Sequence, residues 1–282
     1  MAWKKEENKM VESPFDLTGK IAMVTGASRG LGRNMARALA RAGADLVVTS
    51  RSKKSLAALV KEIESMGSSA YAVELDVRDD RSIRNAAAEA ISIARKIDIL
   101  VNNAGCNIRK PALEMSWQDW NEILDTNLRG AFFMAQAVAK HMIRRRYGRI
   151  INIGSVTSVS GSEGIAPYCA SKGGIKQLTM SLADEWGKFG VTVNCLAPGW
   201  FKTHMNEVLY QNREWVEYLL DRIPLKRPGA PHDLDGIIVF LASDASTYLT
   251  GQTILVDGGI STGATRALPI KNKTSRTKGD LK

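Results

Sequence analysis

Short apolar runs of strand length alternate with stretches of helical periodicity along most of the chain. The run at 20–26 ends in glycine, and the apolar residues after it, at positions 31, 35, 38, 39 and 42, keep the spacing of one helix face until Gly43. A second strand is predicted at 44–50, and a helix at 55–67 again ends in glycine. Five further runs have strand character, each after a helical segment: 70–77, 97–105, 148–155, 191–199 and 253–259.

The predicted strands are apolar almost without interruption, which is typical of strands that crossover helices bury on both faces. The pattern therefore predicts a single-domain α/β fold: a doubly wound, Rossmann-like parallel sheet of seven strands with helices on both faces. We expect a flexible segment at 1–14, a folded domain at 15–262 and a tail at 263–282. The stretch 198–229 interrupts the alternation before the last strand and is predicted to be a helical insertion that serves as a substrate loop or lid.

Composition excludes several classes of protein. With 282 residues, of which 44% are hydrophobic and 24% charged, the chain is typical of globular proteins. No apolar run reaches the ~18 residues of a membrane span, and the first ten residues lack the apolar core of a signal peptide, so we expect a cytoplasmic protein without a membrane partner. Its three cysteines and three histidines are scattered, which predicts reduced thiols and no metal site.

The net charge of +10 raises the question of a nucleic-acid partner. Half of this excess lies in the last 17 residues, where six cations accompany one carboxylate. That tail has almost no apolar periodicity and is predicted to be disordered, and no aromatic residues interleave with a basic stripe elsewhere. We therefore expect no nucleic-acid partner, and the remaining charge suits an anionic small-molecule ligand.

A glycine-rich turn follows the first predicted strand. The sequence TGASRGLG places Gly26, Gly30 and Gly32 before the next helix, at a spacing that differs from the G-x-G-x-x-G fingerprint. Glycines allow a tight turn and a close approach of the backbone, and a helix that begins near Gly30 directs amide groups and the positive end of its dipole at a pyrophosphate. We expect the turn to bind a dinucleotide. Further contacts are expected from its other residues: Ser28, Arg29 and Leu31.

The end of the second predicted strand bears on the choice of dinucleotide. NAD-specific sites usually hold the ribose 2′-hydroxyl with an acidic residue there, whereas a 2′-phosphate requires a cation. This chain has the sequence VVTSRS, with Ser50 and Arg51 in place of the acid, and Arg29 in the glycine turn can reach the same region. The sequence therefore favours NADP(H), with NAD(H) as the alternative.

Tyr168 and Lys172 stand four residues apart in YCASKGG. On a helix this spacing puts both side chains on one face, with about 5–6 Å between their Cβ atoms. Because an adjacent ammonium favours the phenolate, we expect Lys172 to lower the pKa of Tyr168 below its usual ~10. Such a phenol can donate a proton to a carbonyl or withdraw one from an alcohol. Ser155, at the end of the strand 148–155, can hydrogen-bond the same substrate oxygen.

Together with TGASRGLG, LDV at 75–77, NNAG at 102–105, Asn127 in LDTNLRG and PG at 198–199, these residues form an ordered set of motifs. With this set the chain resembles the short-chain dehydrogenase/reductase family in its single-domain form, over about residues 15–260. The resemblance implies hydride transfer between a nicotinamide and a secondary alcohol or ketone. It also implies that the folded domain at 15–262 is the catalytic domain. It implies that Tyr168 is the general acid/base, and that Lys172 binds the nicotinamide ribose and lowers the pKa of the tyrosine. It also implies that Ser155 orients the carbonyl and that Asn127 holds a water of the proton relay.

The resemblance further implies a set of cofactor contacts. Asp76 and Val77 would flank the adenine, and Asn103 would line the cofactor cleft together with its neighbours Ala104 and Gly105. For Asp76, Asn103 and Asn127 the alternative is a purely structural role as turn, loop or cap residues. At the nicotinamide end the contacts would be Pro198, Gly199, Phe201 and Thr203.

Two substrate classes compete, because family membership fixes the reaction better than the substrate. The chain resembles gluconate 5-dehydrogenases, whose NNAG is followed by a basic residue and proline, here Arg109, Lys110 and Pro111. It also resembles 3-oxoacyl-acyl-carrier-protein reductases, but Phe133 and Phe189 stand where those enzymes use arginines to dock their acidic carrier. A guanidinium suits bidentate capture of a carboxylate, so the sugar-acid reading is favoured with Arg109 as substrate contact. A non-catalytic dinucleotide-binding protein is the third alternative.

Two segments carry more apolar residues than one face packed on a sheet requires: 121–143 and 168–189. In the resembled family these helices pair between subunits. The expected assembly is therefore a homotetramer, or a homodimer.

Overall fold

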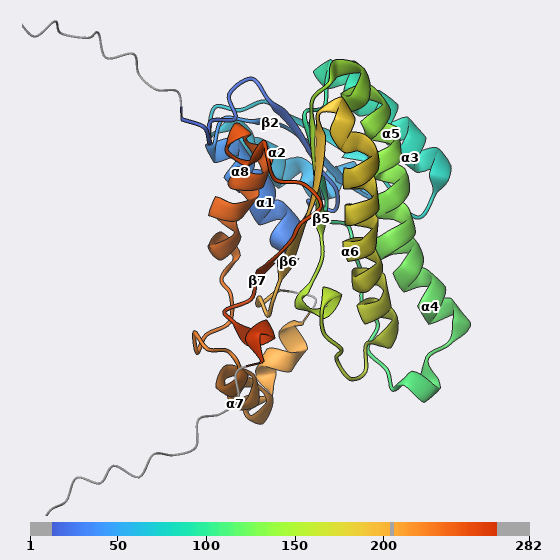
Figure 1. Cartoon of the computed structure of the whole chain (residues 1–282), viewed down its shortest axis with the longest axis vertical. Coiled ribbons are helices and arrows are strands. Elements are labelled where there is room, and N and C mark those ends of the chain that lie inside the picture. Colours follow the sequence, from blue (N-terminus) through green and yellow to red (C-terminus); the bar gives the residue numbers. More distant parts are fainter. Residues whose placement is uncertain (1–12, 204–205, 264–282) are drawn as a thin grey trace, which may run out of the picture.

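The computed structural model describes residues 13–203 and 206–263. Seven parallel strands form one sheet in the order β3-β2-β1-β4-β5-β6-β7, which confirms the predicted doubly wound α/β fold (Figure 1). The predicted segment 1–14, except its last two residues, and the predicted tail 263–282, except Gly263, lie outside the described residues. The strands are β1 (Ile21–Val24), β2 (Asp45–Ser50), β3 (Ala70–Glu74), β4 (Ile99–Asn102), β5 (Gly148–Ile153), β6 (Val191–Pro198) and β7 (Thr253–Val256).

Helices cover both faces of the sheet (Figure 1). Side chains alternate along a strand, so that Ala22 and Val24 of β1 join an apolar cluster with α1, α2 and α8, whereas Ile21 and Met23 join a second cluster with α3, α5 and α6. This double burial explains the continuous apolar runs in the sequence. The helices are α1 (Gly30–Arg41), α2 (Ala57–Glu64), α3 (Asp80–Ala94), α4 (Trp117–Leu124), α5 (Gly130–Arg145), α6 (Ala166–Trp186), α7 (Arg213–Arg222) and α8 (Asp235–Ala242).

The strand order reverses between β1 and β4, because the chain builds β2 and β3 on one side of β1 and the later strands on the other. In open α/β sheets the loops that leave such a switch point diverge and form a crevice at the carboxyl ends of the strands. Here the glycine turn follows β1 and the NNAG loop follows β4. The two motifs are therefore brought to the same crevice.

The insertion 198–229 leaves the sheet at the carboxyl end of β6, as predicted, but its regular helix is confined to a 3-10 turn at Glu207–Gln211 and α7. The ring of Trp215 packs edge-on against Trp200 and Tyr210, with centroids 5.0 and 5.4 Å apart. α7 lies beyond the carboxyl ends of β6 and β7 (Figure 1). This position is the one expected for a segment that covers a ligand.

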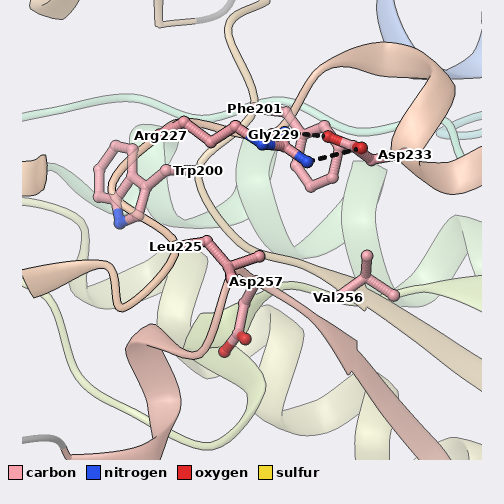
Figure 2. A pocket seen from close by; sticks show the side chains of 9 residues that line it. Trp200, Phe201, Leu225, Arg227, Gly229, Asp233, Val256 and Asp257 are labelled. Carbon is pink, nitrogen blue, oxygen red and sulfur yellow. Dashed lines mark hydrogen bonds and ion pairs between the residues drawn. The ribbon is translucent and has the colours of Figure 1, made fainter.

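A cavity of about 200 Å³ separates the insertion from the end of β7 (Figure 2). Its charged side chains already have partners. Arg227 and Asp233 form a bidentate ion pair, and the carboxylate of Asp257 accepts the N–H groups of Gly259 and Ser261. The cavity is therefore lined by apolar groups and by charges that neutralise one another or bind backbone.

Candidate active site

The glycine turn after β1 forms one wall of the crevice. Gly26 and Gly30 have positive φ angles of 65° and 59°, which residues with a side chain rarely adopt. A Cβ at Gly32 would overlap Asn103 and lie 2.5 Å from the Gly26 carbonyl oxygen. No side chain of the described residues caps α1, and its first turn holds no acidic residue. The first amide groups of α1 and the positive end of its dipole are therefore available to an anion.

Asn103 joins the loop after β4 to this turn. Its side-chain amide donates to the carbonyl oxygens of Thr25 and Gly26 at 2.9 and 3.2 Å. Thr25 Oγ1 in turn accepts the backbone N–H groups of Asn103 and Ala104 at 2.9 and 3.0 Å. Asn103 therefore has a structural role, the alternative given for it above, because its hydrogen bonds hold the loop after β4 against the glycine turn. Thr25 is the partner in this contact, and the sequence did not predict a role for its side chain.

The carboxyl end of β2 carries no carboxylate. Ser50 is buried there and donates from Oγ to the carbonyl oxygen of Ser52 at 2.7 Å, with Ser55 Oγ at 2.8 Å. Arg51 and Arg29 are exposed. The structure thus leaves two cationic groups, and no competing acid on this strand end, for a phosphate.

Asp76 and Val77 follow β3. Both oxygens of Asp76 bind Arg78, at 3.1 Å from Nε and 2.7 Å from Nη2. The side-chain hydrogen bond from Arg78 holds the pKa of Asp76 below its usual value, and the charge of Arg51 adds to this effect. Val77 packs against Gly130 at the start of α5, where a Cβ would lie 2.5 Å from the Val77 carbonyl oxygen. Arg78, absent from the predicted set, therefore holds the side chain predicted to face the adenine.

Three predicted catalytic residues meet at the carboxyl end of β5. α6 places Lys172 Nζ 5.6 Å from the centroid of the Tyr168 ring. The ammonium group donates to the carbonyl oxygen of Ile153, the last residue of β5, at 2.7 Å. Two residues further on, buried Ser155 accepts the N–H of Thr157 on its Oγ at 3.2 Å and lies beside the Tyr168 hydroxyl. A phenol, a hydroxyl and an ammonium therefore share one small site.

Burial sets the proton affinities of this site. It raises the pKa of Tyr168 to about 12, although a hydrogen bond with the Ser155 side chain acts in the opposite direction. Burial also lowers the pKa of Lys172 to about 8. The expectation of a Tyr168 pKa below the usual value is wrong for the chain on its own, because the lost hydration of the phenolate outweighs the interactions that lower the pKa. At neutral pH Tyr168 holds its proton, which is the state of a proton donor.

Asn127 lies in a π-helical turn, Asp125–Arg129, between α4 and α5. Its Oδ1 accepts the N–H of Cys106 at 2.8 Å, and its Nδ2 donates to the Cys106 carbonyl oxygen and to Ser171 Oγ, both at 3.0 Å. Single π turns often occur at functional sites. Because the protein uses both amide protons, the side chain has no donor left for the predicted relay water.

Arg109 lies in the loop after β4 and is exposed. Its Nη1 donates to the carbonyl oxygen of Glu163 at 3.2 Å, and the N–H of Lys110 donates to Gly164 at 3.0 Å. Lys110 also pairs with Asp119 at 2.6 Å. These contacts hold Arg109 against the loop that leads into α6, whose first turn carries Tyr168.

The predicted contacts after β6 occupy different environments. The N–H of Gly199 donates to the Val256 carbonyl oxygen at 2.9 Å, and a Cβ at Gly199 would lie 2.6 Å from Asp257 Cα. The ring of Phe201 packs in the apolar core with 4% of its surface exposed. Thr203 donates to Asn206 Oδ1 from both its N–H and its hydroxyl, at 2.9 and 3.2 Å. Phe201 also lines the cavity beside the insertion.

Thiol and metal chemistry find little support in the part of the chain that the structure describes. Burial raises the pKa of Cys106 and of Cys195, so neither thiol is a favoured thiolate. Within 13–203 and 206–263, no group of three metal-ligating side chains gathers. The same residues include no helix that is long and apolar enough to span a bilayer.

Comparisons with known proteins agree with this geometry. A family model described as enoyl-(acyl carrier protein) reductase matches residues 26–261. Gluconate 5-dehydrogenase of Gluconobacter oxydans is 44% identical over 247 residues, 88% of this chain and 96% of that protein. The 3-oxoacyl-[acyl-carrier-protein] reductase of Rickettsia conorii is 40% identical over 247 residues, covering 87% and 98%. The chain belongs to the short-chain dehydrogenase/reductase family.

A solved structure is also similar over nearly the whole domain. It is a gluconate 5-dehydrogenase from Burkholderia cenocepacia in complex with NADP and tartrate. The two chains share 41% sequence identity with a TM-score of 0.87, and the match covers 89% of this chain and 98% of that one.

Proposed function

We propose that the protein is an NADP(H)-dependent oxidoreductase that interconverts a secondary alcohol and a ketone on a sugar acid, as a gluconate 5-dehydrogenase does. The observation that carries this proposal is the meeting of Tyr168, Ser155 and Lys172 at the carboxyl end of β5. That site adjoins the crevice between the glycine turn and the loop after β4. The proposed proton donor and the proposed dinucleotide site would thus lie side by side, because β4 and β5 are neighbouring strands.

In the direction of reduction, the Tyr168 hydroxyl donates its proton to the substrate carbonyl oxygen, while Ser155 donates a hydrogen bond to the same atom and fixes its position. Bound NADPH supplies the hydride. Lys172, charged at neutral pH, stabilises the phenolate that proton donation leaves on Tyr168. In the direction of oxidation Tyr168 must first lose its proton to act as the base, and burial of the phenol opposes this loss in the chain on its own.

The cofactor would occupy the crevice, with its pyrophosphate at the uncapped start of α1. Arg51 and Arg29 would hold the 2′-phosphate, because both are exposed cations beside a strand end without a carboxylate. The similar enzyme from Burkholderia cenocepacia was solved with NADP. These features support NADP(H) over NAD(H) for this chain.

Arg109 would bind the substrate carboxylate. Its exposed guanidinium keeps donors beyond the one given to Glu163, and the contacts of Lys110 with Gly164 and Asp119 anchor its loop close to Tyr168. Planar guanidinium groups bind carboxylates bidentately. Two of the similar enzymes are gluconate 5-dehydrogenases, and one was solved with tartrate, a hydroxy acid.

A 3-oxoacyl-acyl-carrier-protein reductase is the second candidate, and the 40% identity to the enzyme of Rickettsia conorii favours it. The apolar rings of Phe133 and Phe189 stand against it. Phe133 lies on α5 with 36% of its surface exposed, so this surface offers an acidic carrier a ring where a cation would be needed.

The test is a screen of purified protein with NADPH and NADH against keto sugar acids and 3-oxoacyl thioesters. We expect turnover of a keto sugar acid with NADPH. Arg109→Ala should raise KM for that substrate at least about tenfold, as expected for a lost charge-assisted hydrogen bond, while Arg84→Ala, which removes an exposed arginine from α3, should not. Turnover of thioesters alone, or an unchanged KM in Arg109→Ala, contradicts the proposed substrate.

We also propose that α5 and α6 pair between subunits in a homotetramer, or in a homodimer. Phe133 and Met180 on these helices are exposed by 36% and 47%, and Trp117 and Trp120 add exposed apolar surface on α4. Apolar patches of this kind mark contacts between proteins. Light scattering that finds a monomer at micromolar concentration contradicts this assembly. Cytoplasmic location and the absence of a nucleic-acid partner stay predictions.

A further inference from the structure

One buried hydroxyl connects the catalytic turn of α6 to the loop after β4. Ser171 precedes Lys172 and is completely buried. Its Oγ donates to the Tyr168 carbonyl oxygen at 2.7 Å and accepts the Nδ2–H of Asn127 at 3.0 Å. Asn127 in turn binds both backbone polar groups of Cys106. A single amide therefore bridges the turn that carries Tyr168 and the loop that carries Arg109.

One backbone group fixes the direction of every hydrogen bond in this bridge. The N–H of Cys106 can only donate, so the Asn127 atom that it meets is Oδ1. Nδ2 then faces the Cys106 carbonyl and the Ser171 hydroxyl, and the only proton of that hydroxyl goes to Tyr168. If the Ser171 hydroxyl is removed, one buried N–H of Asn127 loses its acceptor. The hydrogen bond that connects Asn127, and with it the Cys106 loop, to α6 is then lost.

We infer that Ser171 is a positioning residue for the reaction proposed above, acting through Asn127. The loop held at Cys106 carries Asn103 at the cofactor crevice on one side and Arg109 at the substrate side on the other. The other end of the bridge is the turn that holds the proton donor. Ser171 therefore sets the place of cofactor and carboxylate relative to Tyr168. The catalytic part of this inference rests on the proposed function.

Thr179 offers a matched control on the same helix. It is also completely buried, and its Oγ1 donates to the Ile175 carbonyl oxygen at 2.8 Å and accepts from Asn152 Nδ2 at 3.0 Å. Asn152 lies in β5 and binds Asn102 of β4, so this hydroxyl ties α6 to the sheet and not to the loop. Like Ser171→Ala, Thr179→Val removes a buried hydroxyl, and it leaves the side-chain amide of Asn152 without this acceptor.

The test compares Ser171→Ala and Thr179→Val with the wild type by hydrogen exchange of the Cys106 amide and by steady-state kinetics. In Ser171→Ala, exchange at Cys106 should become at least about tenfold faster because its local opening becomes easier. Its kcat should fall roughly tenfold to hundredfold, as misplacement of reacting groups predicts. In Thr179→Val, exchange at Cys106 and kcat should stay near the wild-type values, with a similar loss of thermal stability.

Equal exchange rates at Cys106 in the two variants, or equal losses of kcat, overturn the inference. A wild type that turns over no keto sugar acid refutes the proposed function instead, and the exchange comparison still decides whether the bridge exists. If Ser171→Ala does not fold, Ser171→Thr keeps the hydroxyl, and its exchange at Cys106 should match the wild type. Faster exchange in that folded variant also overturns the inference.

Discussion

The buried ammonium of Lys172 makes the stability of the protein depend on pH in a way that can be calculated. Its pKa falls from 10.5 to about 8 because burial removes its hydration. Between these two values the unfolded chain binds the proton more tightly than the folded chain does. The contribution of Lys172 to the free energy of unfolding therefore rises with pH through this window.

The size of the effect follows from the two pKa values. Holding Lys172 charged in the folded state at neutral pH costs about 3 kcal/mol relative to a lysine in water. Between about pH 7 and about pH 9.5, about 2 kcal/mol of this cost disappears as the folded chain releases the proton. Lys172→Met has no proton to release. It also loses the hydrogen bond to the Ile153 carbonyl oxygen, and the difference between ammonium and amine as the donor of that bond is already contained in the folded-state pKa.

Guanidinium chloride unfolding, followed by tryptophan fluorescence at both pH values and one protein concentration, measures the effect. The free energy of unfolding of the wild type minus that of Lys172→Met should rise by about 2 kcal/mol from the lower to the higher pH. Taking the difference cancels the other titrating groups, which both proteins share. A difference that stays constant would refute a buried, easily deprotonated Lys172 and, with it, the tight ammonium–phenol site.

Three further predictions concern two residues of the proposed cofactor site, Gly32 and Arg51, and the ion-paired Asp98 at the amino end of β4. Gly32→Ala should destabilise the protein by about 1–3 kcal/mol in chemical denaturation, since its Cβ would overlap Asn103; unchanged stability contradicts the close packing of the turn. Arg51→Asp should raise KM for NADPH at least about tenfold, the loss of one charge-assisted contact, without raising KM for NADH; parallel changes contradict 2′-phosphate binding. Asp98, although burial acts to raise its pKa, has a lowered pKa because Lys96, the Ile21 N–H and Arg145 bind it. Asp98→Asn should therefore cost about 3 kcal/mol at neutral pH, and the cost should shrink as pH falls through the range where the wild-type carboxylate protonates; a pH-independent cost contradicts the ion pairs.

The fold could be predicted because each element carries its own local signal. Strands buried on both faces are apolar throughout, and β1 shows why: Ala22 faces one helical layer and Met23 the other. The helix after β1 begins at Gly30, as predicted from the glycine turn. The helix type within the insertion 198–229 could not be predicted, because apolar spacing alone does not separate a 3-10 turn from an α-helix.

The site could be predicted only in part, because some of its properties depend on long-range contacts. Tyr168 and Lys172 share a helix face by spacing alone, but the pKa of Tyr168 depends on how deeply the fold buries it. Asn103 was recognised as part of a motif, yet its partner Thr25 lies 78 residues away. The hydroxyl of Ser171 meets Asn127 across 44 residues. No local pattern encodes such pairs.

Replacement of one hydroxyl tests the central claim most directly. Tyr168→Phe keeps the ring and removes the proton donor, so kcat for NADPH-dependent reduction of a keto sugar acid should fall at least about a hundredfold. The dissociation constant of NADPH, followed by its fluorescence, should stay close to that of the wild type. Turnover that survives the substitution would contradict the assignment of Tyr168 as the proton donor.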